Sequence, residues 1–218
     1  MPDISREESK LRLLSCSQFV SSLASKDPVP GGGGAAALWG ALGAALGNMV
    51  IQLTLGKRRY ADYEADHLRI QEELTRLQEE LLLMIDRDAE EFAPLAAAYG
   101  IKAETTDEKA AKEAILQSAL QNACRIPLLI MQTAYRCLQL QQELAPISST
   151  IAISDIACGV QGLRAALLAA RVNVLINLAS IEDAGFYEGL LLEINELTAK
   201  GVALADQLFA AIEADFLE

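Results

Sequence analysis

Residues 28–60 read PVPGGGGAAALWGALGAALGNMVIQLTLGKRRY, and this stretch decides the fold. No charged residue occurs in residues 28–56, a length sufficient to cross a bilayer core of about 30 Å. Alanine and glycine dominate the stretch, however, and its helical part carries the polar residues Asn48 and Thr54. This composition favours a helix over about residues 33–55 that other protein helices bury on all sides, rather than a membrane span.

Small residues recur along this helix at helical spacing, at Ala36, Gly40, Gly43, Ala44 and Gly47. A glycine inside a helix costs about 1 kcal/mol relative to alanine, so several on one face indicate that another backbone approaches closely there. Packed membrane helices use the same small-residue spacing, and its physics does not require lipid. The pattern leaves open whether the contact serves packing alone or also lines a site.

The rest of the chain predicts an all-α fold, because proline is rare and alternating β-branched residues are nearly absent. We expect further helices over about residues 15–25, 62–99, 106–144 with a kink at Pro127, 149–181 and 187–216. No low-complexity linker separates them. We therefore predict one domain over residues 1–218, built from long and mostly antiparallel helices.

Composition excludes several classes of function. The formal net charge of −12 disfavours nucleic acid and an anionic membrane surface as partners. The chain has one histidine, His67, and no closely spaced pair among its four cysteines, so we expect no metal site. Residues 1–12 do not resemble a signal peptide, and we expect reduced thiols in a cytoplasmic protein.

The clearest candidate for a functional residue is Asp88. An apolar stripe runs along the helix expected over residues 62–99, at Ile70, Leu74, Leu77, Leu81, Ile85, Phe92 and Leu95. At about 100° per residue, Asp88 falls near the centre of that buried face, whereas Asp86 points nearly the opposite way. A buried carboxylate needs a cation, hydrogen-bond donors or a raised pKa. Asp88 is therefore either a site residue or an aspartate satisfied by a backbone or arginine partner.

Polar residues interrupt apolar faces on two other predicted helices. Asn122 lies in the middle of an apolar face of the helix over residues 106–144. The helix over residues 149–181 carries a second stripe, at Asp155, Gly159, Gly162, Ala166, Ala169, Asn173 and Asn177. Its small central residues leave either a groove for a flat ligand or the contact surface of a neighbouring helix.

Both ends of the first long helix carry candidate anion-binding groups. The glycines Gly31, Gly32 and Gly33 lack the lysine and hydroxyl residue of a phosphate loop, and no βαβ unit surrounds them. They lead into a helix whose free N–H groups can meet an anion such as a carboxylate. At the other end, Lys57, Arg58 and Arg59 form either a solvated helix terminus or a grip for an anionic ligand tail.

Several motifs together carry a resemblance to a known family. These are PGGG at residues 30–33, LTLGKRRY at 53–60, DRDA at 86–89, IPL at 126–128, SDI at 154–156, NVLINL at 173–178 and IED at 181–183. The chain resembles the cyclodeaminase/cyclohydrolase family in matches spread from about residue 19 to 186. The resemblance implies an all-helical homodimer that binds folate near the glycine loop and the family's polar residues.

The resemblance also implies a reaction on a tetrahydrofolate derivative, with no metal and no cofactor beyond that substrate. The reaction is either methenyltetrahydrofolate cyclohydrolysis or formiminotetrahydrofolate cyclodeamination, and both pass through a positively charged carbon that a buried carboxylate stabilises. Asp88 and Asp155 are the candidate acid/base or electrostatic residues. Asn122, Asn173 and Asn177 would orient the pterin or water, and residues 57–59 would hold the glutamate tail.

Two alternatives remain open at this point. A helical binding or scaffold protein that has kept the folate-enzyme fold, without catalysis, has the same patterns. A folate-binding regulator would bind without turnover. Between the two enzyme reactions, the chain carries no formiminotransferase domain, which slightly favours the cyclohydrolase.

Overall fold

The computed structural model describes residues 10–217 and is helical throughout its regular structure, with no strand in that range. The elements are, in chain order, η1 (Leu11–Leu13), α2 (Cys16–Leu23), α3 (Gly32–Thr54), η2 (Arg58–Tyr63), α4 (Glu64–Gly100), α5 (Thr106–Ala123), α6 (Arg125–Leu144), η3 (Ala145–Ile147), η4 (Thr150–Ala152), α7 (Ile153–Leu178) and α8 (Ala184–Asp215). The prediction of an all-α fold is confirmed. Most of residues 1–12, on which the absence of a signal peptide was predicted, lie outside the described range.

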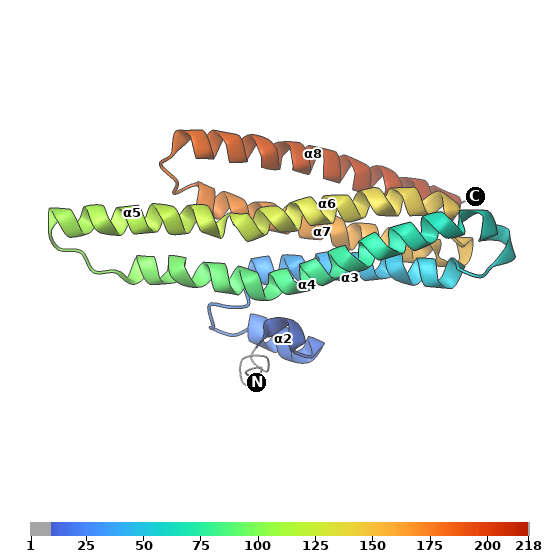
Figure 1. Cartoon of the computed structure of the whole chain (residues 1–218), viewed down its shortest axis with the longest axis horizontal. Coiled ribbons are helices and arrows are strands. Elements are labelled where there is room, and N and C mark those ends of the chain that lie inside the picture. The colour runs from blue at the N-terminus through green and yellow to red at the C-terminus, as the bar shows by residue number, and fades with distance from the viewer. Residues whose placement is uncertain (1–9, 218) are drawn as a thin grey trace.

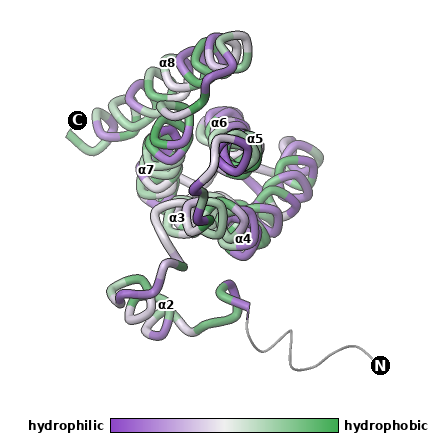
Figure 2. Tube along the Cα trace, turned by 90° about the vertical axis from the view of Figure 1, so that its left-hand side faces the viewer, coloured by the Kyte–Doolittle hydropathy of each residue, from purple (hydrophilic) through white to green (hydrophobic). Residues whose placement is uncertain are grey.

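The six long helices form an elongated bundle in which neighbours along the chain run antiparallel, apart from α5 and α6, which follow one another in nearly one line (Figure 1). Viewed along the bundle, α2 and α8 lie on opposite outer sides of the group formed by α3 to α7 (Figure 2). The α4–α5 hairpin extends beyond the other helices at one end (Figure 1). The η2 segment turns the chain at the opposite end.

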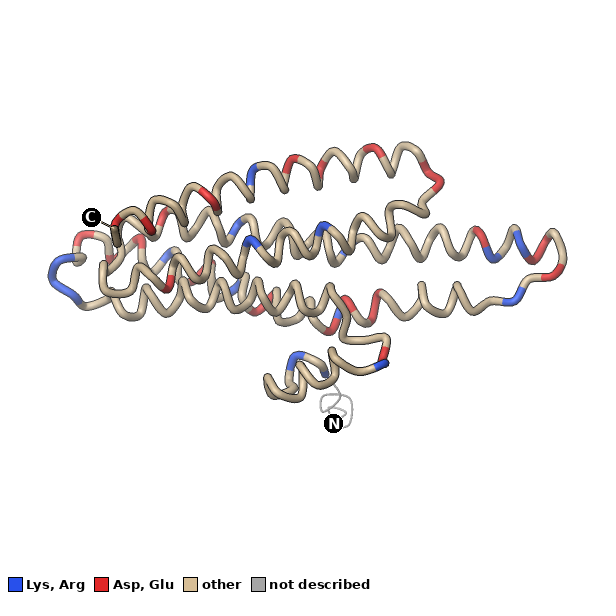
Figure 3. The backbone as a smooth tube through the Cα atoms, turned by 180° about the vertical axis from the view of Figure 1, so that it is seen from behind, with Lys and Arg blue, Asp and Glu red and all other residues tan. Residues whose placement is uncertain are grey.

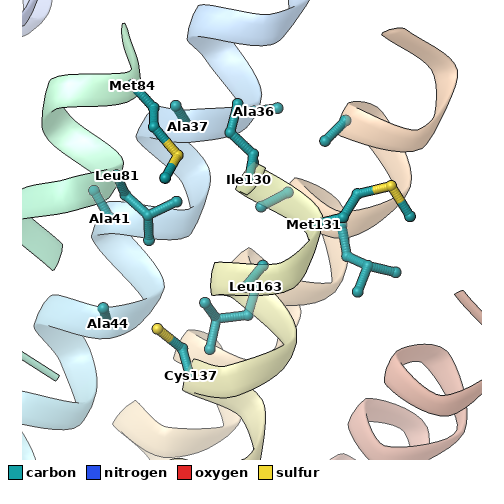
Figure 4. Close-up of a cluster of buried hydrophobic side chains, with 14 of the residues drawn as sticks. Ala36, Ala37, Ala41, Ala44, Leu81, Met84, Ile130, Met131, Cys137 and Leu163 are labelled. Carbon is teal, nitrogen blue, oxygen red and sulfur yellow. The ribbon is translucent and has the colours of Figure 1, made fainter. Parts of the chain in front are cut away.

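Helix α3 is the centre of the packing, as its uncharged sequence predicts. It packs against α7 and α4, and its alanines Ala36, Ala37 and Ala44 are fully buried. Their short side chains lie beside larger ones from the neighbouring helices, such as Leu81 and Ile130 (Figure 4). By length and composition, α3 and residues 150–178 are also apolar enough to cross a membrane, a test that buried core helices of soluble proteins pass too. The expectation that other helices bury α3 on all sides is wrong, because Trp39, Leu42, Met49 and Leu53 on its outer face are each 45–54% exposed.

The glycines of α3 mark the places where neighbouring helices come closest. A Cβ atom added at Gly43 would lie 2.8 Å from the carbonyl oxygen of Gly159 and 2.6 Å from Leu163 Cγ, both on α7. A Cβ at Gly40 would lie 3.0 Å from Leu81 on α4. Gly43 and Gly159 are joined further by Gln141 of α6, whose Nε2 donates to the Gly43 carbonyl at 2.7 Å. Close approach of the α7 backbone therefore accounts for Gly43, and the Leu81 side chain accounts for Gly40.

Two details of the helices differ from the sequence-based expectations. The helix expected over residues 106–144 ends at Ala123 and restarts at Arg125, so the break lies at Cys124, three residues before Pro127. Asp86, expected to point away from the buried face, is only 8% exposed. The N-terminal segment covers it, and Arg12 pairs with its carboxylate at 2.6 Å.

We expect Gly43→Ala to lower the free energy of unfolding by about 1–3 kcal/mol, because the added methyl group overpacks the contact between α3 and α7. Gly189→Ala on α8 is the matched control, since nothing lies within 4 Å of a Cβ at that position. This control should gain about 0.5–1 kcal/mol from helix propensity. Urea denaturation measures both. Equal effects of the two substitutions would contradict the close contact.

Candidate functional site

A cavity of about 170 Å³ opens where the N-terminus of α3 meets α4, α7 and the junction of α5 and α6. Its lining is Pro28, Val29, Gly31, Gly32, Gly33, Asp88, Phe92, Ala123, Pro127, Asn173, Ile176 and Asn177. Six of the residues singled out from the sequence, the three glycines, Asp88 and the two α7 asparagines, therefore line one cavity. Their roles there stay predictions until they are measured.

Asp88 lies directly against the first turn of α3. Gly31, the N-cap of that helix, has no side chain to accept a hydrogen bond from the free N–H groups. A Cβ atom at Gly33 would collide with the Asp88 carboxylate, and a hydrogen bond from the Gly34 N–H reaches the same group. Asp88 thus supplies from α4 the acceptor that α3 lacks. Only glycine at position 33 leaves room for it.

The protonation of Asp88 is set mainly by its surroundings. Burial raises the pKa of Asp88 from 3.8 to about 6, because desolvation penalises the ionised form. The hydrogen bond from Gly34 acts in the opposite direction but is the smaller effect. A carboxyl group with a pKa near 6 exists in both protonation states close to neutral pH. It can therefore accept a proton and return it within one reaction cycle.

Asn173 and Asn177 present amide groups on the α7 side of the cavity. Asn173 Nδ2 donates to the Ala169 carbonyl at 2.9 Å, and Asn177 Nδ2 donates to the Asn173 carbonyl at 3.1 Å and the Ala123 carbonyl at 3.2 Å. With the nitrogen atoms held in this way, the Oδ1 atoms are left as acceptors for a ligand. The Asn173 amide would lie 3.3 Å from a Cβ at Gly32, so it faces the glycine loop.

None of the residues in the apolar walls of the cavity was predicted from the sequence to be a site residue, although Phe92 was placed on the apolar stripe that Asp88 interrupts. Phe92 follows Asp88 by one helical turn, and Ile176 lies between the two asparagines on α7. Both positions can be recognised once the polar residues are known, because Phe92 shares a helix face with Asp88 and Ile176 shares one with the asparagines. Pro28, Val29 and Pro127 complete the walls from loop and helix-start positions. Apolar walls around a few polar groups are typical of small-molecule sites.

The remaining candidates lie elsewhere in the chain. Asn122 is exposed and lines a shallow groove with Ile115 and Ala119, two residues of the helix face on which it was placed, and with Pro94 of α4. Asp155 lies in the first turn of α7, about 27 Å along that helix from Asn173. Neither residue lines the cavity around Asp88.

The basic residues Lys57, Arg58 and Arg59 follow the C-terminus of α3, at the end opposite to the glycine loop (Figure 3). Helix α3 has 23 residues, which corresponds to about 34 Å between its two ends. Lys57 Nζ donates to Ser149 Oγ at 2.8 Å, which places this cluster beside the start of α7. Asp155 and the three basic residues therefore gather at one end of α3, and Asp88 lies at the other.

The fold and the cavity define a class of protein, an all-helical bundle with a small pocket whose floor carries a half-buried carboxylate. A family model described as formiminotransferase-cyclodeaminase matches residues 15–215. The chain belongs to the formiminotransferase-cyclodeaminase family, and the resemblance inferred from the sequence is confirmed. Among residues 10–217, no three histidine, cysteine, aspartate or glutamate side chains gather as a metal site would require.

Individual relatives give the same assignment. The chain is 37% identical over 196 residues to a methenyltetrahydrofolate cyclohydrolase from Methylorubrum extorquens, covering 90% of this chain and 94% of that protein. It is 30% identical to the formimidoyltransferase-cyclodeaminase of Rattus norvegicus and spans 39% of that longer protein. The crystal structure of a formiminotetrahydrofolate cyclodeaminase from Thermotoga maritima superimposes with a TM-score of 0.85 at 27% identity, covering 95% of this chain and all of that one.

We expect Asp88→Asn to stabilise the protein, and more so at higher pH. The raised pKa means that the folded state disfavours ionisation, so wild-type stability falls as the pH rises from 3.8 through about 6 and stays lower above it. From these pKa values, the variant gains about 1 kcal/mol at pH 4.5 and about 3 kcal/mol at pH 7.5. Urea denaturation at both pH values measures the gain. A gain independent of pH would contradict the burial of the charge.

Proposed function

We propose that this chain is a folate one-carbon enzyme, a methenyltetrahydrofolate cyclohydrolase in which Asp88 is the catalytic carboxylate. The observation that carries this proposal is a half-buried carboxyl group with a pKa of about 6 in a pocket with apolar walls. The Methylorubrum cyclohydrolase, matched over nearly its whole length, supports the substrate class.

The proposed reaction adds water to the methenyl carbon, whose positive charge is shared with two nitrogen atoms. The Asp88 carboxylate stabilises that cation and accepts a proton as the water oxygen bonds to the carbon. One carbon–nitrogen bond then breaks, and the protonated Asp88 returns a proton to the leaving nitrogen. The product is formyltetrahydrofolate, and one proton is released overall. Neither electron transfer nor a redox cofactor is part of this chemistry, and we propose that no metal is needed.

The cavity is too small for the whole substrate. Its volume of about 170 Å³ lies below the roughly 300–1,000 Å³ of typical ligand pockets. We propose that it holds the pterin end with its one-carbon unit, oriented by the amides of Asn173 and Asn177 and by the backbone of residues 31–33. The remainder of the folate then extends outward, past the exposed Ile176.

A second candidate is the cyclodeaminase reaction, which the structural similarity to the Thermotoga protein favours. In that reaction the second folate nitrogen attacks the formimino carbon, the ring closes, and ammonia leaves after taking up a proton. Asp88 would serve as the proton donor. The same pocket suits both reactions, because both develop positive charge at the same carbon.

We propose further that the protein is a homodimer joined through α3 and α7. Large apolar side chains are exposed along the outer face of these helices, and α3 carries no charge. They are Trp39 at 45% exposure, Leu42 at 54%, Met49 at 46% and Leu53 at 45% on α3, with Val172 at 63% and Ile176 at 69% on α7. Exposed apolar surface of this extent on a water-soluble protein calls for a partner. The four free thiols fit a reducing compartment, and we propose that the dimer is cytoplasmic.

An antiparallel pairing of α3 with its copy would resolve the separation of the candidate residues. A two-fold axis across the middle of α3 brings the basic end of one subunit beside the glycine loop of the other. Lys57, Arg58 and Arg59 of the partner subunit would then hold the glutamate tail that leaves the cavity. Asp155 of the partner subunit would approach the same substrate, because it lies at the basic end.

We expect purified protein to hydrolyse methenyltetrahydrofolate, measured by absorbance loss above the buffer rate. Because the carboxylate must be ionised, kcat/KM should rise with pH up to about 6 and then level off. Asp88→Asn should lower kcat/KM roughly 10²–10⁴-fold. The rise of kcat/KM with pH up to about 6 should also disappear in this variant. Glu196→Gln, on the exposed surface of α8, is the matched control and should change neither.

Ammonia release from formiminotetrahydrofolate, measured in parallel, decides between the two reactions. Turnover of neither substrate would contradict the proposed function and favour a non-catalytic binding or scaffold protein. Full activity in a folded Asp88→Asn variant would remove Asp88 from the mechanism.

Mixed dimers test the shared site. We expect Asp88→Asn and a Lys57→Ala/Arg58→Ala/Arg59→Ala variant to be strongly impaired as separate homodimers. A heterodimer of the two, purified through two different tags, contains one pocket with both Asp88 and an intact basic cluster from the partner. It should therefore recover about half of the wild-type activity. No recovery above the mean of the two parents would place the basic cluster in its own subunit's site.

A further inference from the structure

The N-terminal strap, defined as residues 11–30, connects α4 with the wall of the cavity. It begins at η1, continues through α2 and ends in the loop whose Pro28 and Val29 line the pocket around Asp88. Several contacts attach it to the bundle, and Leu11 and Leu14 pack partly buried against the core. Phe19 of α2 is 4% exposed and belongs to the hydrophobic core, and Arg12 binds Asp86. Figure 1 shows that α2 otherwise lies outside the main bundle.

Asp86 binds the strap through two hydrogen bonds. Its Oδ2 atom accepts from Arg12 Nη1 at 2.6 Å, and its Oδ1 atom accepts from the backbone N–H of Arg12 at 3.2 Å. The Asp86 side chain is only 10% exposed and that of Arg12 21%. A charged pair this well covered is stronger and more specific than an exposed surface pair. It therefore fixes where the strap lies on α4.

Three neighbouring residues of α4, Ile85, Asp86 and Asp88, contact the strap or the first turn of α3. Asp86 holds the strap, and Asp88 meets the first turn of α3. Ile85 precedes Asp86, and its Cγ2 lies 3.8 Å from a Cβ placed at Gly34. Pro30 Cβ lies 3.5 Å from the same position. The strap is thus anchored at Asp86 and re-enters the bundle within one turn of the catalytic candidate.

We propose that Arg12 and Asp86 are positioning residues, whose ion pair places Pro28 and Val29 as the outer wall over the ligand that faces Asp88. This inference rests on the proposed function for its kinetic readout. Without the ion pair the strap loses its polar anchor, and the wall no longer holds a fixed distance from Asp88. Because small displacements of a binding wall weaken substrate orientation, binding should suffer more than the chemical step.

Arg12→Ala and Asp86→Asn test the proposal, each with kcat and KM measured separately. We expect KM to rise roughly 10-fold in both variants, while kcat changes less than about 3-fold. Arg12→Lys should keep KM close to the wild-type value. The exchanged pair Arg12→Asp/Asp86→Arg should bring KM part of the way back to the wild-type value. Arg76→Ala, which breaks an exposed ion pair on the same helix, is the matched control and should leave KM unchanged.

Hydrogen–deuterium exchange gives a readout that does not depend on turnover. We expect faster exchange in residues 11–30 of Arg12→Ala, with α3 and α7 unchanged. If exchange and KM both stay at wild-type values, the positioning role is wrong. If exchange rises across the whole bundle and kcat falls with KM, the pair is merely structural. An inactive wild-type protein with a strap that loosens as expected would overturn the proposed function and leave the anchoring intact.

Discussion

The structure depends on how closely α3 can approach its neighbours. Glycines at positions 40 and 43 let α4 and α7 pack against the backbone of α3, and Gly33 leaves room for the Asp88 carboxylate at its first turn. The helix in turn offers that carboxylate a backbone donor, while the surrounding bundle removes much of its water. The packing of the bundle and the surroundings of Asp88 therefore both depend on the glycines of α3, a helix without charged residues.

The helices and the half-buried position of Asp88 were predictable from the sequence because both follow from periodicity. Asp88 interrupts an apolar stripe, and the structure places it at the cavity as a half-buried group. Asp86 was misjudged, since periodicity describes one helix and cannot foresee that Arg12, 74 positions earlier, covers its other face. Asn122 shares its helix face with Ile115 and Ala119 as expected, but that face lines a groove other than the cavity around Asp88, which the pattern of one helix cannot reveal.

Distances between sites were harder to predict than helices. Both ends of residues 28–60 carry candidate anion-binding groups. The helix of 23 residues between them keeps these groups about 34 Å apart within one chain. In the antiparallel dimer that we propose, the glycine loop and the basic cluster would serve one substrate. Sequence patterns cannot reveal such a relation, because a symmetry axis leaves no spacing in the chain. The exposed apolar face of α3 and α7 is the structural feature that points to it.

The most direct test of the central claim is a titration of Asp88 itself, by NMR of the carboxyl carbon in protein labelled with ¹³C-aspartate. The resonance is assigned as the one missing from Asp88→Asn. A midpoint near pH 6 is expected, because desolvation at the first turn of α3 outweighs the hydrogen bond from Gly34. A midpoint near 3.8, the ordinary value for aspartate, would contradict the account. In that case Asp88 would be a solvated helix cap without the proposed chemistry.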